Sequence, residues 1–90
     1  MKAAWTLVFS GRVQGVGFRM TSRALAREHP IAGWVRNRED GTVQMYVEGR
    51  PEDLERYLGA LQGVMGRKIE NTQVESGEPT GRMQGFEIRR

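Results

Sequence analysis

The stretch from Gly11 to Arg19 places the strongest constraint on how this chain can fold. Its sequence, GRVQGVGFR, follows a run of strand-forming residues and precedes a run of helix-forming residues. Glycine adopts positive φ angles readily and lets a ligand approach the main chain closely. Consecutive N–H groups in such a loop, completed by the first turn of a helix, can converge on an anion. The stretch therefore predicts a strand, a tight loop and a helix.

Taken by itself, this loop has two interpretations. One is a plain strand-to-helix turn followed by a surface arginine, which is the commoner case for a glycine-rich loop. In the other, Arg19 lies in the first helical turn, where its guanidinium can donate to two oxygens of a phosphate. The loop lacks the Gly-Lys-Ser/Thr ending of a P-loop and the last glycine of a dinucleotide-binding loop. Its spacing alone indicates an anion and does not identify it.

Hydrophobic periodicity predicts five strands and two helices along the chain. Strands are expected where apolar and polar residues alternate, and helices where apolar residues recur at i, i+3, i+4 and i+7. Pro30 should end the first helix and Gly63 the second, and Asp40-Gly41 signals a hairpin. The expected strands are Trp5–Ser10, Gly33–Asn37, Val43–Glu48, Ile69–Ser76 and Phe86–Arg89, and the expected helices are Phe18–Glu28 and Pro51–Gly63.

Two of these elements carry a finer prediction. In the first helix, Phe18, Thr21, Ala24 and Leu25 share one side and should face the core. In the weak fourth strand, Ile69 and Val74 are five residues apart and so out of phase for one face. A β-bulge between the two would restore the phase.

The order of the elements predicts the fold class. Strand, helix, strand, strand, helix, strand (βαββαβ), plus a short C-terminal strand, is the α+β arrangement of a ferredoxin-like α/β sandwich, with two helices on one face of an antiparallel or mixed sheet. In this topology the third strand lies antiparallel between the first and the second. The glycine loop and Asn37 then lie at the same edge of the sheet, two strand spacings or about 10 Å apart from backbone to backbone. We therefore expect them to form one site.

Composition limits the kinds of site and the setting. Ninety residues make one domain, residues 1–90, and the chain has no cysteine and a single histidine, His29, which argues against a zinc or iron site. We expect no metal and no other cofactor. The net charge of +3 comes from interspersed charges, typical of a solvated surface. Because no leader pattern and no long apolar run occurs, the expected location is the cytoplasm.

Two long motifs together resemble the signatures of the acylphosphatase family. The stretch Gly11–Arg19 is similar to the phosphate-loop signature of that family, and Gly33-Trp34-Val35-Arg36-Asn37, followed by Asp40-Gly41-Thr42-Val43, is similar to its second signature. The ending Gly85-Phe86-Glu87-Ile88-Arg89 also matches, so the resemblance covers essentially the whole chain.

This resemblance implies a function and a set of site residues. The implied reaction is hydrolysis of the carboxyl–phosphate bond of an acyl phosphate, with inorganic phosphate as a product and no metal or organic cofactor. Arg19 matches the phosphate-binding arginine, and Asn37 matches the asparagine that places the attacking water. The main-chain phosphate cradle corresponds to Gln14, Gly15, Val16, Gly17 and Phe18. Partners other than this small substrate, such as nucleic acid, a membrane or a second copy, are not expected.

Two other interpretations compete with this one. The same scaffold could serve as a non-catalytic module that binds an anion or RNA. The third strand, however, offers a single aromatic residue, Tyr46, where RNA-binding sheets carry several. The chain could also correspond to an acylphosphatase-like domain of a larger maturation protein, which the ends at Met1 and Arg90 make less favoured.

Overall fold

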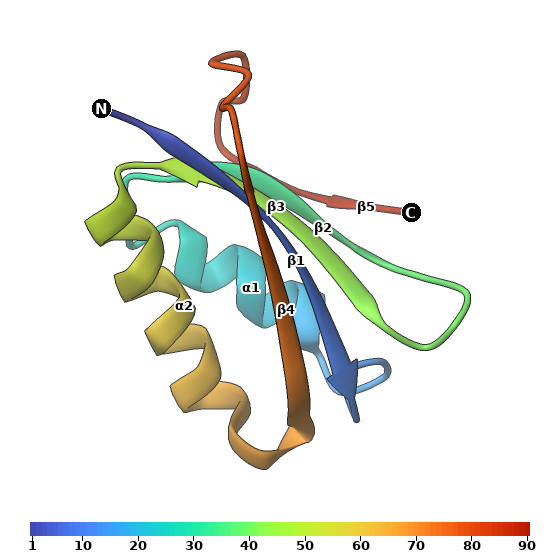
Figure 1. Ribbon diagram of the computed structural model, residues 1–90. Helices are drawn as coiled ribbons and strands as arrows, with labels where there is room; N and C mark the ends of the chain where they lie inside the picture. The colour runs from blue at the N-terminus through green and yellow to red at the C-terminus, as the bar shows by residue number, and fades with distance from the viewer.

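Both helices pack on one face of a single mixed sheet in the computed structural model, which describes residues 1–90 (Figure 1). The five strands have the order β4-β1-β3-β2-β5. A single turn of 3₁₀-helix, Gly66–Lys68, precedes β4. The predicted ferredoxin-like fold is thereby confirmed. The strands are β1 (Ala3–Gly11), β2 (Ala32–Asn37), β3 (Val43–Gly49), β4 (Ile69–Gly77) and β5 (Phe86–Arg89), and the helices are α1 (Phe18–Ala26) and α2 (Pro51–Met65).

The register of the three central strands, β1, β3 and β2, fixes which strand ends lie beside each other. Strand β3 is antiparallel to both β1 and β2, and only β2 and β5 pair in parallel. Val43, at the start of β3, lies opposite Phe9 on one side and opposite Asn37 on the other. The end of β1 and the end of β2 are therefore level with each other, as the topology predicts.

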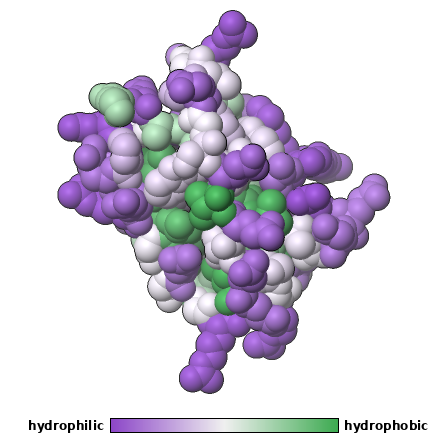
Figure 2. All heavy atoms as spheres, viewed as in Figure 1, coloured by the Kyte–Doolittle hydropathy of each residue, from purple (hydrophilic) through white to green (hydrophobic).

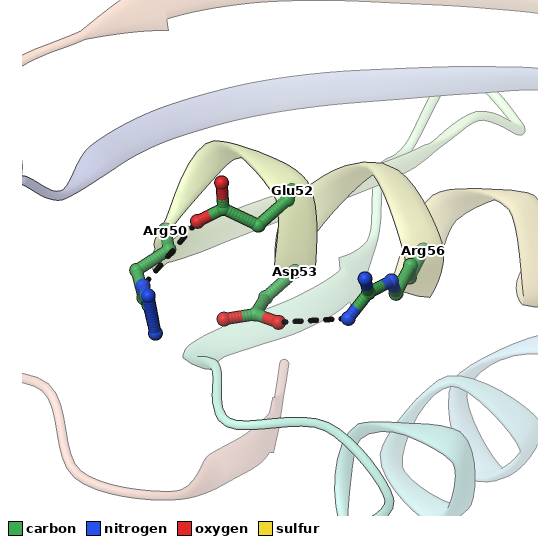
Figure 3. A network of polar contacts seen from close by, with 4 residues as sticks. All are labelled: Arg50, Glu52, Asp53 and Arg56. Carbon is green, nitrogen blue, oxygen red and sulfur yellow. Dashed lines mark ion pairs between the residues drawn. The ribbon is translucent and has the colours of Figure 1, made fainter.

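The core lies between this sheet and the two helices. Burying one large apolar side chain contributes roughly 1.5–3 kcal/mol. The ion pairs at the start of α2, by comparison, are Arg50–Glu52 at 3.3 Å and Arg56–Asp53 at 3.8 Å (Figure 3). Both side chains of the first pair and Arg56 of the second are exposed to water, and exposed pairs contribute about 0–1 kcal/mol, so burial holds the layers together. The fully buried residues of the core include Leu7, Phe9, Val35, Val43, Met45 and Val47 from the sheet, and Leu54, Tyr57 and Leu61 from α2.

The face of the molecule shown in Figure 2 is largely hydrophilic, with a smaller hydrophobic area near the middle of the view. Strand β4 crosses the front of the molecule in the same view (Figure 1). It is an edge strand, and its Val74 is 48% exposed between Gln73 and Glu75. Polar and charged neighbours of this kind limit pairing with other strands. Neither helix is long and apolar enough to cross a lipid bilayer.

The ends of both helices differ from the prediction. Helix α1 ends at Ala26 and not at Glu28, because the residues before Pro30 form a tight turn with i→i+3 bonds, such as His29 N–H to Ala26 O at 3.2 Å. Helix α2 continues past Gly63 and ends at Met65, with Gly66 as its C-cap. Burial of the Met65 side chain outweighs the roughly 1 kcal/mol that a helical glycine costs.

The inward face of α1 differs in part from the predicted one. Phe18 is buried and Leu25 packs against the core, as predicted, but Ser22 and Ala26 are also buried and Ala24 is exposed. Ser22 can be buried because its polar atoms have partners. Its Oγ–H donates to Phe18 O at 2.8 Å, and its carbonyl accepts from the Tyr57 hydroxyl at 2.8 Å. Burial raises the pKa of Tyr57, which keeps this hydroxyl protonated as a donor between the two helices.

The bulge predicted in the fourth strand is present. Ser10 pairs with Asn71, but Gly11 pairs with Ile69, so Glu70 is the extra residue. The side chain of Ile69 accordingly packs against the core. The bulge lies where β1 leads into the glycine loop, and it marks the end of the regular pairing between β1 and β4.

On the uncovered face of the sheet, Glu48 anchors the connection between β4 and β5. Glu48 as a whole residue is 6% exposed. Its carboxylate accepts hydrogen bonds from the Tyr46 hydroxyl at 2.6 Å and from Thr80 N–H at 2.9 Å. Burial works to raise the pKa of Glu48, but these hydrogen bonds outweigh it and hold the pKa below its ordinary value of 4.5. The charged form is therefore favoured in the folded protein.

Replacing Glu48 tests this anchor. Glu48→Gln should lower the free energy of unfolding by about 1 kcal/mol at pH 7, the difference between hydrogen bonds to charged and to neutral acceptors. Since the folded pKa is depressed, the stabilisation is complete above pH 4.5 and is lost as the pH falls through the folded value. Urea unfolding of both proteins from pH 7 to pH 3 measures the difference. A constant difference across this range, or an equal effect of Glu87→Gln on the exposed surface, would contradict the assignment.

Candidate functional site

The main chain between β1 and α1 presents a row of free N–H groups. From Val13 to Met20, no main-chain N–H donates to a main-chain carbonyl, whereas Arg12 N–H donates to Lys68 O and Thr21 N–H donates to Gly17 O, both at 2.9 Å. Helix α1 has no side-chain cap and no acidic residue in its first turn. The positive end of the helix dipole is therefore not neutralised by the chain itself. Such a loop is suited to bind an anion.

Two glycines give the loop its shape. Gly15 has φ 74° and Gly17, at the N-cap of α1, has φ 79°. Both angles lie in the left-handed region, which other residues avoid. A Cβ at either position would meet no atom within 4 Å, so backbone conformation and not space requires glycine here. The loop turns toward the helix at these two residues.

A small cavity of about 90 Å³ opens between this loop and the end of β2. It is far below the roughly 300–1,000 Å³ of sites for drug-sized ligands, and it suits a small anion. Among its lining residues only Arg19 carries a charge, and no carboxylate or histidine contributes. The lining residues are Val13, Gly15, Gly17, Phe18, Arg19, Met20 and Asn37.

Most of the predicted site residues meet at this cavity. Gly15, Gly17, Phe18 and Arg19 come from the loop and the first turn of α1, and Asn37 comes from the end of β2. Val16, by contrast, is half-buried and packs against the core. The side chain of Gln14 does not line the cavity either, and its amide instead donates to Arg38 O and Thr42 O.

Sequence reasoning missed two lining residues. Met20 directly follows Arg19 in the first turn of α1, and this position could have indicated it. Val13 is an apolar residue inside a polar loop, a pattern typical of simple burial, and it is 1% exposed. Both are apolar, so they shape the cavity and supply no charge.

The two polar side chains of the cavity have unused bonding capacity. Asn37 Oδ1 is buried and has no hydrogen-bond partner. An unmade hydrogen bond of this kind costs about 1–3 kcal/mol, so the atom marks a place for a donor from outside the chain. The three ion pairs of the structure do not involve Arg19, whose charge is available to an anion. No group of three or more His, Cys, Asp or Glu side chains is placed to hold a metal ion.

Comparison with known proteins finds relatives along almost the whole chain. The family model described as Acylphosphatase matches residues 5–88, which include every residue of the cavity. An acylphosphatase of Bacillus licheniformis is 41% identical over 85 residues, covering 93% of this chain and 94% of that protein. An acylphosphatase of Cupriavidus necator is 43% identical over 91 residues, covering 98% of this chain and 95% of that protein.

A solved structure gives the same result for the fold. The crystal structure of acylphosphatase from Bacillus subtilis matches with a TM-score of 0.89 and 30% identity, covering 98% of this chain and 99% of that one. The likeness in sequence and in fold therefore extends over the same elements that form the cavity.

The need for glycine in the loop is testable by stability. Gly17→Ala should destabilise the protein by about 1–2 kcal/mol, because alanine is strained at a positive φ angle. The matched control is Gly59→Ala in the exposed interior of α2, which should stabilise by about 0.5–1 kcal/mol. Denaturant unfolding measures both. If Gly17→Ala were neutral or stabilising, the left-handed conformation would not be required at the start of α1.

Proposed function

Because this chain belongs to the acylphosphatase family, whose members hydrolyse acyl phosphates, we propose that it carries out this reaction with a main-chain cradle, one arginine and one asparagine. The products are a carboxylate and inorganic phosphate. One observation carries the proposal: Gly15, Gly17 and Phe18, whose N–H groups make no main-chain hydrogen bond, line one small cavity together with Arg19 and with Asn37, whose amide oxygen has no partner.

The cradle binds the phosphoryl group. The N–H groups of Gln14, Gly15, Val16, Gly17 and Phe18 make no other main-chain bond, so they can donate to its oxygens together. The uncapped start of α1 adds the positive end of the helix dipole. Because these donors are fixed by the backbone, they need little rearrangement as charge develops on the phosphoryl oxygens.

Arg19 supplies the positive charge. It lies in the first turn of α1, next to the N-cap, and lines the cavity. Its planar guanidinium donates two parallel hydrogen bonds to two phosphoryl oxygens, which a lysine cannot reproduce in the same geometry. Phosphoryl transfer depends mainly on such positioning and charge neutralisation.

Asn37 places the attacking water. Its Oδ1, which has no partner within the protein, accepts a hydrogen bond from this water and directs its oxygen toward phosphorus. An amide offers a donor and an acceptor without a charge that would repel the phosphate. Because Asn37 is no base at neutral pH, the proton of the water passes to a phosphoryl oxygen of the substrate.

The absence of acids and histidine from the cavity lining fits this chemistry. The leaving carboxylate is stable as an anion, so no general acid has to protonate it. The remaining tasks are to hold the phosphoryl group and to align the water with the bond that breaks.

Arg19→Lys tests the two-oxygen contact. Inorganic phosphate should inhibit this variant at least about tenfold more weakly than the wild type, because a lost charge-assisted hydrogen bond is worth roughly 1.5–3 kcal/mol. Turnover of benzoyl phosphate in a buffer with EDTA should fall as well. Arg27→Lys, at the exposed C-cap of α1, is the matched control and should leave both values unchanged. Unaltered phosphate inhibition in Arg19→Lys would contradict the contact.

Asn37→Ala separates the water-placing role from binding. Turnover of benzoyl phosphate should fall by at least about a hundredfold, because water alignment matters in the transition state and hardly in the ground state. Inhibition by inorganic phosphate should stay nearly unchanged, since the cradle and Arg19 remain. Asn71→Ala, on the exposed side of β4, is the control.

A parallel loss of phosphate affinity in Asn37→Ala would make Asn37 a binding residue and refute its assigned role. A wild-type protein that binds phosphate but turns over no acyl phosphate would instead support a binding module.

A further inference from the structure

Gln14 ties the glycine loop to the turn between β2 and β3. Its Nε2 donates to Arg38 O at 2.7 Å and to Thr42 O at 2.9 Å. We propose that Gln14 is a positioning residue for hydrolysis, which through these two hydrogen bonds fixes Asn37 relative to the phosphate cradle. This inference rests on the proposed function and gives the Gln14 side chain a role distinct from that of its main-chain N–H.

The two carbonyls that Gln14 holds belong to one closed turn. Arg38 N–H donates to Thr42 O at 2.9 Å, and Gly41 N–H donates to Arg38 O at 3.3 Å. Inside the turn, Asp40 Oδ1 accepts from Thr42 Oγ1–H at 2.6 Å and from Thr42 N–H at 3.0 Å. These hydrogen bonds from Thr42 lower the pKa of Asp40, so its carboxylate is a charged acceptor. The turn is therefore tied together as one unit by its own hydrogen bonds.

Asn37 is connected directly to this unit. It precedes Arg38 in the chain, and its last sheet partner is Val43, the residue after Thr42. A displacement of the Arg38 and Thr42 carbonyls therefore displaces the backbone on both sides of the Asn37–Val43 pair. The position of the Asn37 side chain depends on how the turn is held.

Gln14 makes the hydrogen bonds that hold the turn to the loop. The main chains of β1 and β2 both end their pairing with β3 at Val43, and no main-chain hydrogen bond joins residues 12–17 to residues 38–42. The amide of Gln14 can donate twice, and both hydrogens are used. Two carbonyl acceptors also settle which end of the amide is the nitrogen.

The cradle itself has other anchors. Val13 and Phe18 are buried at its two ends, and the ring centroids of Phe18 and Phe9 are 5.0 Å apart. Arg12 N–H is bonded to Lys68 O and Thr21 N–H to Gly17 O. Removing the amide of Gln14 should therefore leave the shape of the cradle unchanged, while the position of Asn37 relative to the cradle becomes less well fixed.

Gln14→Met is the first variant, because methionine has a similar length and no donor. We expect turnover of benzoyl phosphate to fall about ten- to a hundredfold, the effect of misplacing a reacting group by up to about 1 Å. Inhibition by inorganic phosphate should stay within about twofold of the wild type, since an interaction that serves the transition state leaves ground-state binding unchanged. Gln14→Glu should lose more turnover than Gln14→Met, because a carboxylate oxygen would face two carbonyl oxygens.

A double-mutant cycle with Asn37→Ala decides whether Gln14 acts through Asn37. If it does, adding Gln14→Met to Asn37→Ala should reduce turnover less than about twofold further. If Gln14→Met reduces turnover as strongly in the Asn37→Ala background as it does in the wild-type background, the inference is overturned and the role of Asn37 stays intact. If Gln14→Met lowers turnover and Asn37→Ala does not, the proposed function fails instead.

Folding is checked with the same samples. Because only a folded loop binds phosphate, wild-type inhibition by phosphate shows that Gln14→Met is folded. Should this variant unfold, Gln14→Asn replaces it in the cycle, since the shorter amide reaches one carbonyl and should give an intermediate loss. The control, Gln73→Met on the exposed face of β4, should match the wild type. Equal turnover in wild type, Gln14→Met and Gln14→Glu would refute the positioning role.

Discussion

The pairing of β3 with both β1 and β2 is the constraint on which the rest of the site depends. Val43 lies opposite Phe9 and Asn37 at once, which brings the two strand ends level. Phe9 leads into the glycine loop and Asn37 lines the cavity. A shift of one residue in the β2–β3 pairing would turn Asn37 to the other face of the sheet, and the same shift in the β1–β3 pairing would turn Phe9, because side chains alternate along a strand. The buried side chains of Phe9 and Val43 hold this register.

Sequence patterns predict the fold well where one signal agrees with another. The alternation in β1, the Asp40-Gly41 hairpin signal and the apolar face of α2 indicate the order of the elements, and the third strand lies between the first and the second as predicted. The family and enzyme class are also confirmed. The errors lie where tertiary contacts decide. Ser22 can be buried beside Phe18 and Ala26 because the Tyr57 hydroxyl, far along the chain, supplies a hydrogen bond to its carbonyl. Burial of Met65 likewise extends α2 past Gly63.

The same limit applies to the candidate site. Positive φ angles at Gly15 and Gly17 follow from the glycine pattern, and topology brings Asn37 to the loop. The roles of Arg19 and Asn37 in catalysis remain predictions. A role for the Gln14 side chain could not be predicted, because its partners are two main-chain carbonyls more than twenty residues away. Carbonyls carry no sequence signal, so only the structure reveals this contact.

The site combines hydrogen-bond donors and one acceptor that the chain does not satisfy with a core that does not depend on them. The free N–H groups and Asn37 Oδ1 lie at the edge of the sheet, whereas the core extends along both helices. Unmade hydrogen bonds lower stability, and they also keep the donors ready for a ligand. Because backbone geometry fixes most of these donors, side-chain substitutions alter the cradle only through glycine conformation or through contacts between segments. The link from Gln14 to the β2–β3 turn is such a contact, and on the proposed mechanism we expect it to make water placement separable from phosphate binding by mutation.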